Sequence, residues 1–128
     1  MSHRSKALLC AVSCCWVILA QADDVVSKGR WTDYMSDAMP QTFCQDGSYY
    51  RSCFSIDEQR CTSVAQQGVR QCLSSLASEI PDQLSMPQDG KKWGEEVGEC
   101  AGNAYERELA EGYKKDSVKC NDPSAWRE

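Results

Sequence analysis

The chain has 128 residues, of which 14 are basic and 19 acidic, and it contains nine cysteines and a single histidine. Its net charge of −5 argues against nucleic acid or an anionic membrane surface as a partner. Because the only histidine is His3, the rest of the chain can form no Ser-His or Cys-His catalytic pair and no histidine metal site.

Residues 1–22 have the features of a secretory signal peptide. Two basic residues precede an apolar run over residues 7–20, and residues 20–22 read Ala-Gln-Ala, an A-x-A-type cleavage site. The run is too short to span a bilayer, so we expect no transmembrane anchor. A lipoprotein cysteine at position 14 or 15 is the weaker alternative, since apolar residues continue beyond it. We therefore expect residues 23–128 to form one exported domain, periplasmic in a Gram-negative bacterium and secreted otherwise.

Cleavage would leave six of the nine cysteines and would change the net charge from −5 to −7, because Arg4 and Lys6 are lost. An even number of cysteines in a small exported chain indicates a disulfide framework. Residues 23–128 contain only 14 Leu, Ile, Val and Phe residues, fewer than the ~20% typical of chains that fold on apolar burial alone. Disulfides, worth about 2–4 kcal/mol each, are expected to supply the difference.

Three helices are expected in chain order. Apolar residues at helical spacing predict the first over Val25–Met39, ended by Pro40. An ordered connection over residues 40–54 leads to a long amphipathic helix over Ser55–Ile80, with a Ser55/Glu58 capping box and Pro81 as its stop. A turn over residues 81–90 leads to the third helix, over residues 91–119, and no convincing strand is visible. The fold class is therefore all-α: a small three-helix, disulfide-stapled bundle built on a long antiparallel helical hairpin.

The spacing of the cysteines predicts how they pair. Cys61 and Cys72 share one face of the central helix but lie about 16 Å apart along it, beyond the ~7 Å between Cα atoms that a disulfide allows. Facing positions of an antiparallel hairpin that turns near residue 86 have numbers that sum to about 172, as those of Cys72 and Cys100 do. The numbers of Cys53 and Cys120 sum to 173. The expected pairs are therefore Cys72–Cys100, Cys53–Cys120 and, by elimination, Cys44–Cys61.

Carboxylates are the remaining candidates for chemistry. Glu95, Glu96, Glu99 and Glu106 could supply an acid/base pair on one helix, which would make the protein a hydrolase. A solvated face is the stronger interpretation, since Glu95 to Glu99 lie early in the predicted last helix and three lysines lie at its end, as the helix dipole favours. We expect no enzymatic activity, no cofactor and no metal.

Two groups of residues are candidates for partner binding. Gly94, Gly98 and Gly102 recur every four residues, which indicates either a close helix approach beside Cys100 or a shallow groove for a partner. In the first connection, Tyr49, Tyr50 and Arg51 have side chains common at interfaces, and the tyrosines serve equally well as aromatic core.

The leading hypothesis for function is a non-enzymatic exported module that binds another exported or envelope protein, as an inhibitor, an immunity-type protein or an assembly factor. The alternative is a carrier of a small apolar ligand, held between helices in a cavity lined by Trp93, Tyr105 and Leu109. A carboxylate-based hydrolase is third.

Overall fold

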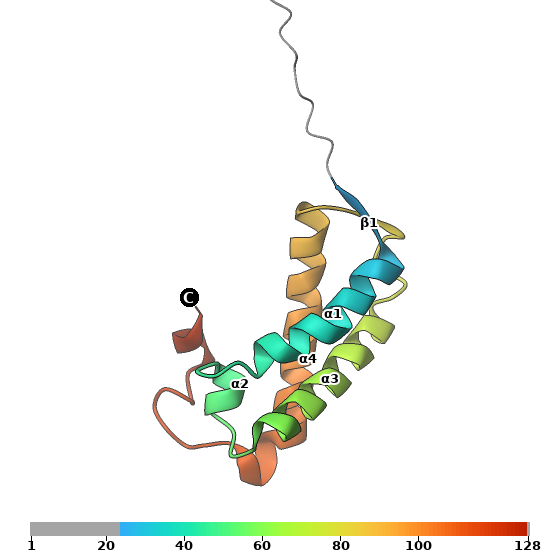
Figure 1. Ribbon diagram of the computed structural model, residues 1–128. Helices are drawn as coiled ribbons and strands as arrows, with labels where there is room; N and C mark the ends of the chain where they lie inside the picture. Colours follow the sequence, from blue (N-terminus) through green and yellow to red (C-terminus); the bar gives the residue numbers. More distant parts are fainter. Residues whose placement is uncertain (1–23, 128) are drawn as a thin grey trace, which may run out of the picture.

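A computed structural model describes residues 24–127, and the signal-peptide prediction falls on residues outside this range. The described chain is mostly helical, as predicted, with elements in the order β1, α1, α2, α3, β2, α4 and η1 (Figure 1). The helices are α1 (Lys28–Phe43), α2 (Tyr49–Ser52), α3 (Glu58–Ser75), α4 (Gln88–Tyr113) and the 3-10 turn η1 (Pro123–Trp126). No helix among these residues is both long enough and apolar enough to cross a bilayer.

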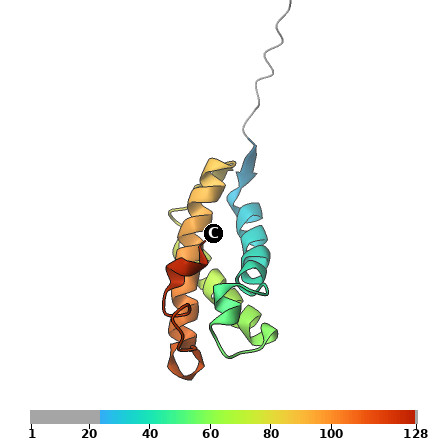
Figure 2. The ribbon, with the colours of Figure 1, turned by 90° about the vertical axis from the view of Figure 1, so that its left-hand side faces the viewer.

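Helix α3 is the central element. It packs along both α1 and α4, whereas α1 and α4 contact each other little. Cys72–Cys100 joins α3 to α4, and an ideal Cβ on Gly68 would meet the carbonyl oxygen of Ala101 at 3.3 Å, so Gly68 lets the two helices approach closely. Figure 2 shows α1 and α4 from the side, one on each flank of α3. Helix α3 is therefore the element that holds α1 and α4 in one bundle.

The all-α prediction is wrong in one respect, because a two-stranded antiparallel sheet is present. Strand β1 (Val25–Ser27) pairs with β2 (Gln83–Ser85), and Val26 lies opposite Leu84, which is fully buried. The ion pair from Lys28 to Asp82, at 3.0 Å, continues the contact. Strands of three residues are too short to show an alternating pattern, so residues 81–90 had been interpreted as a turn alone.

The helix boundaries differ from those predicted. Pro40 lies inside α1, which continues to Phe43. Helix α3 is capped by Asp57, whose side chain accepts a hydrogen bond from the Arg60 amide at 2.7 Å, and not by Ser55. The amide of Ser55 instead donates to the carbonyl of Tyr113. Helix α3 ends at Ser75, and turns carry the chain on to Pro81.

The end of α4 also differs. Its regular geometry stops before Glu111, and Gly112 adopts φ +84°. Lys114, Lys115 and Lys119 therefore follow the helix and do not form its last turn. The dipole argument made for those lysines is wrong, because the helix ends earlier than its polar pattern suggested.

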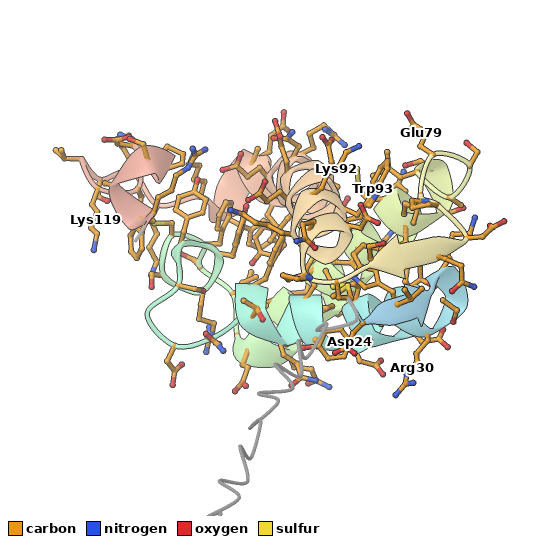
Figure 3. All side chains as sticks on the ribbon, turned by 90° about the horizontal axis from the view of Figure 1, so that it is seen from above. Asp24, Arg30, Glu79, Lys92, Trp93 and Lys119 are labelled. Atoms are coloured by element: carbon orange, nitrogen blue, oxygen red, sulfur yellow. A yellow bond between two sulfur atoms is a disulfide. The ribbon has the colours of Figure 1, made fainter. Side chains whose placement is uncertain are left out.

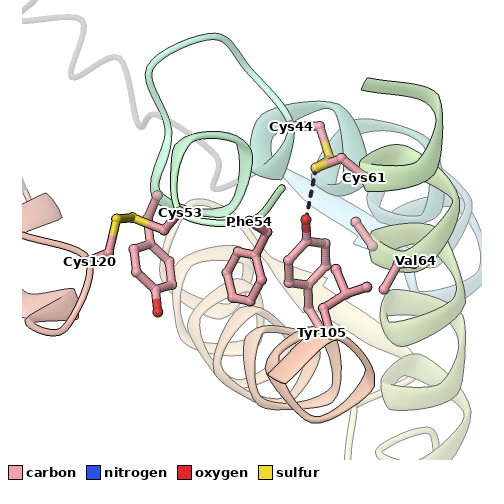
Figure 4. Packing of buried hydrophobic residues seen from close by; sticks show 10 residues of the cluster. Cys44, Cys53, Phe54, Cys61, Val64, Tyr105 and Cys120 are labelled. Carbon is pink, nitrogen blue, oxygen red and sulfur yellow. Dashed lines mark hydrogen bonds between the residues drawn. A yellow bond between two sulfur atoms is a disulfide. The ribbon is translucent and has the colours of Figure 1, made fainter. Parts of the chain in front are cut away.

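Two groups of buried side chains form the core. The sheet-end cluster lies between α1, α3, α4 and the strands; its main members are Trp31, Val69, Leu73, Ile80, Leu84, Trp93 and Val97. The aromatic cluster lies at the other end; its main members are Tyr49, Phe54, Val64, Tyr105 and Leu109 (Figure 4). Four of the six disulfide cysteines belong to the aromatic cluster. Covalent bridges therefore reinforce the end of the molecule where aliphatic residues are scarce.

Candidate functional site

The structure contains three disulfides, Cys44–Cys61, Cys53–Cys120 and Cys72–Cys100, which are the three pairs derived from cysteine spacing. The derivation fails for one of them. Cys53 is the C-cap of α2, and Cys120 lies in a turn beyond α4, so neither is on the helical hairpin. They meet because the chain stays antiparallel past the helix ends, where Phe54 forms a bridge with Lys114.

Helix α2, which the sequence did not predict, carries the two tyrosines chosen as binding candidates. Ser48 caps it by accepting a hydrogen bond from the Arg51 amide at 3.2 Å. The Tyr50 ring stacks on Phe43 of α1 at a centroid distance of 4.3 Å, and its edge meets Tyr105 of α4 at 5.0 Å. Tyr50 thus links α1, α2 and α4, and it forms one wall of an open groove.

The groove has a volume of about 770 Å³ and runs along α4. Its lining residues are Tyr50, Glu95, Gly98, Glu99, Gly102, Asn103, Glu106 and Arg127. Gly98 leaves room in its floor, whereas the space over Gly102 is taken by Tyr50. An ideal Cβ on Gly102 would lie 2.2 Å from Oη of Tyr50, so that ring reaches over the helix only because position 102 is glycine. We call this feature the α4 groove.

The α4 groove is acidic. Positions 95, 99 and 106 are separated by four and seven residues, which places their side chains on one helical face. Three carboxylates therefore face a single basic lining side chain, that of Arg127. The Tyr49 hydroxyl donates a hydrogen bond to Oε1 of Glu106, which fixes that carboxylate against α2. Burial and the bond to Glu106 together raise the pKa of Tyr49 well above its usual value.

Tyr105 contacts Tyr50, which forms the wall of the groove. Its hydroxyl donates to the carbonyl of Tyr50 at 3.0 Å and lies 3.2 Å from Sγ of Cys61 (Figure 4). Burial raises the pKa of Tyr105 to about 12. The pKa of Tyr50 is also raised, by burial and by Glu106, against the opposing charge of Arg127. Neutral phenols therefore hold α2 onto α4 at all ordinary pH values.

The predicted binding residues separate into those at the groove and those away from it. Tyr50, Gly98 and Gly102 line it, while Gly94 lies farther along α4 against the end of Met35. Tyr49, together with Tyr50, lines a second cavity of about 710 Å³. Arg51 is elsewhere: its Nη1 donates to the carbonyl of Ile56, and its Nε is buried without a hydrogen-bond partner in the described structure.

The glycine stripe does not bring helix backbones together. Gly94 and Gly98 face the ends of the Met35 and Met39 side chains of α1, each 3.9 Å from an ideal Cβ. The close α3–α4 approach uses Gly68 instead, which the sequence analysis did not select. Sequence reasoning also missed Asn103 and Arg127, whereas the predicted solvated face fits Glu95 and Glu99, which are both exposed. The spacing of these glutamates relative to Gly98 and Gly102 was the available signal for the groove.

Two other features bear on the alternatives. Trp93 belongs to the sheet-end cluster, whereas Tyr105 and Leu109 belong to the aromatic cluster, so these three residues do not line one cavity. Across residues 24–127, no group of three or more Asp, Glu, Cys or His side chains is arranged to hold a metal ion.

Comparison with known proteins identifies one family. A protein-family model described as "NttA: T2SS substrate NttA" matches residues 25–112, a range that contains both strands and nearly all of α1 to α4. No curated protein and no solved structure matches the chain. The description refers to the type II secretion system, so the protein is an exported one. Because the match covers more than half of the sequence, the chain belongs to the family of the T2SS substrate NttA.

Proposed function

We propose that this protein is a non-enzymatic binding module that leaves the cell by type II secretion and holds a basic segment of a partner protein in the α4 groove. The observation that carries the proposal is the lining of the groove, in which Glu95, Glu99 and Glu106 lie beside Gly98 and the ring of Tyr50. Such a groove admits an extended chain, and its charge favours basic side chains.

Arginine fits this lining better than lysine. A guanidinium group can form two parallel hydrogen bonds to one carboxylate and can also stack on an aromatic ring. Tyr50 supplies a ring at the wall, and Glu95 and Glu99 lie one helical turn apart, a spacing at which the Cβ atoms of two residues are about 5–6 Å from each other. Successive basic side chains of an extended segment could therefore contact successive glutamates.

The absence of enzymatic activity is part of the proposal. It rests on the sequence, whose only histidine is His3, and on the three disulfides, which leave none of the six cysteines beyond residue 22 as a thiolate nucleophile. The partner, on this proposal, is an exported or envelope protein with an exposed arginine-bearing segment.

The test is titration of the protein with fluorescent oligoarginine, with an oligoglutamate of equal length as the charge control. We expect binding of oligoarginine alone, weakening as salt is added because exposed charges are screened beyond about 10 Å at 0.1 M. The double variant Glu95→Gln/Glu99→Gln should lose at least about fivefold in affinity, on the basis of about 0.5 kcal/mol per exposed charge pair.

The matched control is Glu79→Gln, which removes an exposed carboxylate outside the groove (Figure 3). Equal loss of affinity in Glu79→Gln and in Glu99→Gln would show that net charge, and not the groove, attracts the peptide. Failure of the unmodified protein to bind oligoarginine even at low salt would contradict the proposal outright.

A further inference from the structure

The chain places one of its own arginines in the α4 groove. Arg127 follows η1 and lines the groove together with Tyr50 and the three glutamates. It is the basic member of the lining, and its positive charge is close enough to oppose the rise in the pKa of Tyr50. A guanidinium thus already occupies one end of a site whose acidic lining suits guanidinium groups.

Several contacts fasten the segment that carries Arg127. The Cys53–Cys120 disulfide joins it to the end of α2, and the amide of Lys115 donates to the carbonyl of Cys53 at 2.8 Å. The indole Nε1 of Trp126 donates to the carbonyl of Lys119 at 2.9 Å, and Nζ of Lys119 lies 3.9 Å from the centre of the Trp126 ring. The segment is therefore an ordered part of the fold.

Trp126 is the contact next to Arg127. Its ring meets Tyr49 edge-on at a centroid distance of 5.9 Å, and both residues line the second cavity. Arg127, the next residue, lines the α4 groove together with Tyr50 and Glu106. Figure 1 shows the C-terminal segment next to α2. Trp126 thus anchors the segment, and Arg127 follows it at the groove.

The position of Arg127 suits a removable cover. Arg127 is exposed, and within residues 24–127 it forms no ion pair of 4 Å or less with a groove carboxylate. An incoming basic side chain would therefore have to overcome only a screened, longer-range attraction between Arg127 and the groove glutamates. The disulfide at Cys120 lies seven residues before Arg127, so residues 126–127 can move relative to the groove while Cys120 stays bonded to Cys53.

We infer that residues 126–127 are a built-in competitor for the α4 groove, in which Arg127 takes the place of the first arginine of the partner. This inference rests on the proposed function and adds its regulation: the groove is partly covered until a segment with several arginines displaces Arg127. A single arginine side chain would compete poorly with the tethered one, whereas several linked arginines gain from the remaining glutamates.

The experiment measures the dissociation constant of oligoarginine for residues 23–128 with the disulfides intact. Two variants remove the cover in different ways. Arg127→Gln removes its charge, and Trp126→Ala keeps the charge but removes the anchor. Both are expected to bind up to about twofold more tightly than the unmodified protein, because Arg127 forms no direct ion pair in the groove and a screened attraction contributes less than an exposed ion pair does. The control is Arg30→Gln, which removes an exposed positive charge on α1 (Figure 3) and should leave the affinity unchanged.

Four outcomes are decisive. Tighter binding by Arg127→Gln and Trp126→Ala, with Arg30→Gln unchanged, supports the inference. Equal gains in Arg127→Gln and Arg30→Gln would overturn it, since net charge would then explain the effect. If the unmodified protein binds and neither cover variant gains, the cover is refuted while the proposed function stands. If neither the unmodified protein nor Arg127→Gln binds, both are refuted. Circular dichroism shows whether Trp126→Ala folds. If it does not, the affinity of Arg127→Gln alone tests the inference, because this substitution is at an exposed position.

Discussion

Substitution of the groove glycines by alanine separates the contribution of the groove to stability from its contribution to binding. Gly98 and Gly102 are one turn apart on α4, and alanine is favoured over glycine inside a helix by about 1 kcal/mol. At Gly98 the new methyl group would meet only the end of Met39, at 3.9 Å, which is an ordinary contact. Gly98→Ala is therefore expected to raise the free energy of unfolding by about 0.5–1 kcal/mol. In a domain of this size, each kcal/mol raises Tm by roughly 4–8 °C.

At Gly102 the same methyl group would lie 2.2 Å from Oη of Tyr50. The Tyr50 ring has little room to move, because it stacks on Phe43 and meets Tyr105 edge-on. Overpacking of this kind costs about 1–3 kcal/mol, so the helix-propensity gain is cancelled or exceeded. We expect Gly102→Ala to change the free energy of unfolding by between about 0 and −2 kcal/mol.

The assay is thermal unfolding followed by circular dichroism, with the disulfides intact in every variant. A third measurement isolates the clash: in a Tyr50→Ala background, Gly102→Ala should become stabilising by about 1 kcal/mol, because the obstructing hydroxyl is gone. Binding gives the second readout. Gly98→Ala should be more stable than the unmodified protein but should bind oligoarginine more weakly, since its methyl group occupies the groove floor. An equal rise in Tm for Gly98→Ala and Gly102→Ala would refute the placement of Tyr50 over the helix.

Two further predictions concern the core. In the chain-entropy model a disulfide stabilises the folded state more when it closes a longer loop. The Cys53→Ser/Cys120→Ser variant, whose cysteines are 67 residues apart, should lose about 4 kcal/mol of unfolding free energy. The Cys44→Ser/Cys61→Ser variant, with a separation of 17, should lose about 3 kcal/mol. Denaturant unfolding measures both, and the reverse order would contradict the entropic account. Because the pKa of Tyr105 is raised to about 12, the neutral phenol stabilises the folded state in full below pH ~10, and this contribution is lost as the pH rises through about 12. Stability measured across that range should fall, and Tyr105→Phe should remove part of the fall; an unchanged pH profile in Tyr105→Phe would refute the assignment.

The sequence was most informative where single residues impose long-range constraints. Cys72 and Cys100 could be paired from position numbers alone, because a disulfide limits how far apart two helices can be. The pairing of Cys53 with Cys120 matches the same arithmetic for another reason, since a bridge from Phe54 to Lys114 continues the hairpin outside the helices. Periodicity located the three long helices and erred at their ends.

Short elements and side-chain surroundings could not be predicted. Strands of three residues and a helix of four leave no periodic pattern, and they form because neighbours far along the chain hold them. Asp57 and Ser55 are both good caps, and only the pairing of Ser55 with Tyr113 decides between them. The α4 groove depends on where α2 and Arg127 lie relative to α4, which no local pattern encodes. The sequence indicates the glycines and the exposure of Glu95 and Glu99, but not that these residues line one groove.

The most direct test of the account maps the oligoarginine site by nuclear magnetic resonance on the isotope-labelled protein. Addition of the peptide should shift the backbone amide signals of Gly98, Gly102 and Asn103, together with that of Arg127 as the peptide displaces it. The amides around Glu58 and Thr62, which belong to a separate surface that also carries Asp46, should stay in place. Shifts confined to that second surface, or spread evenly over all acidic positions, would contradict an acidic groove on α4 as the binding site.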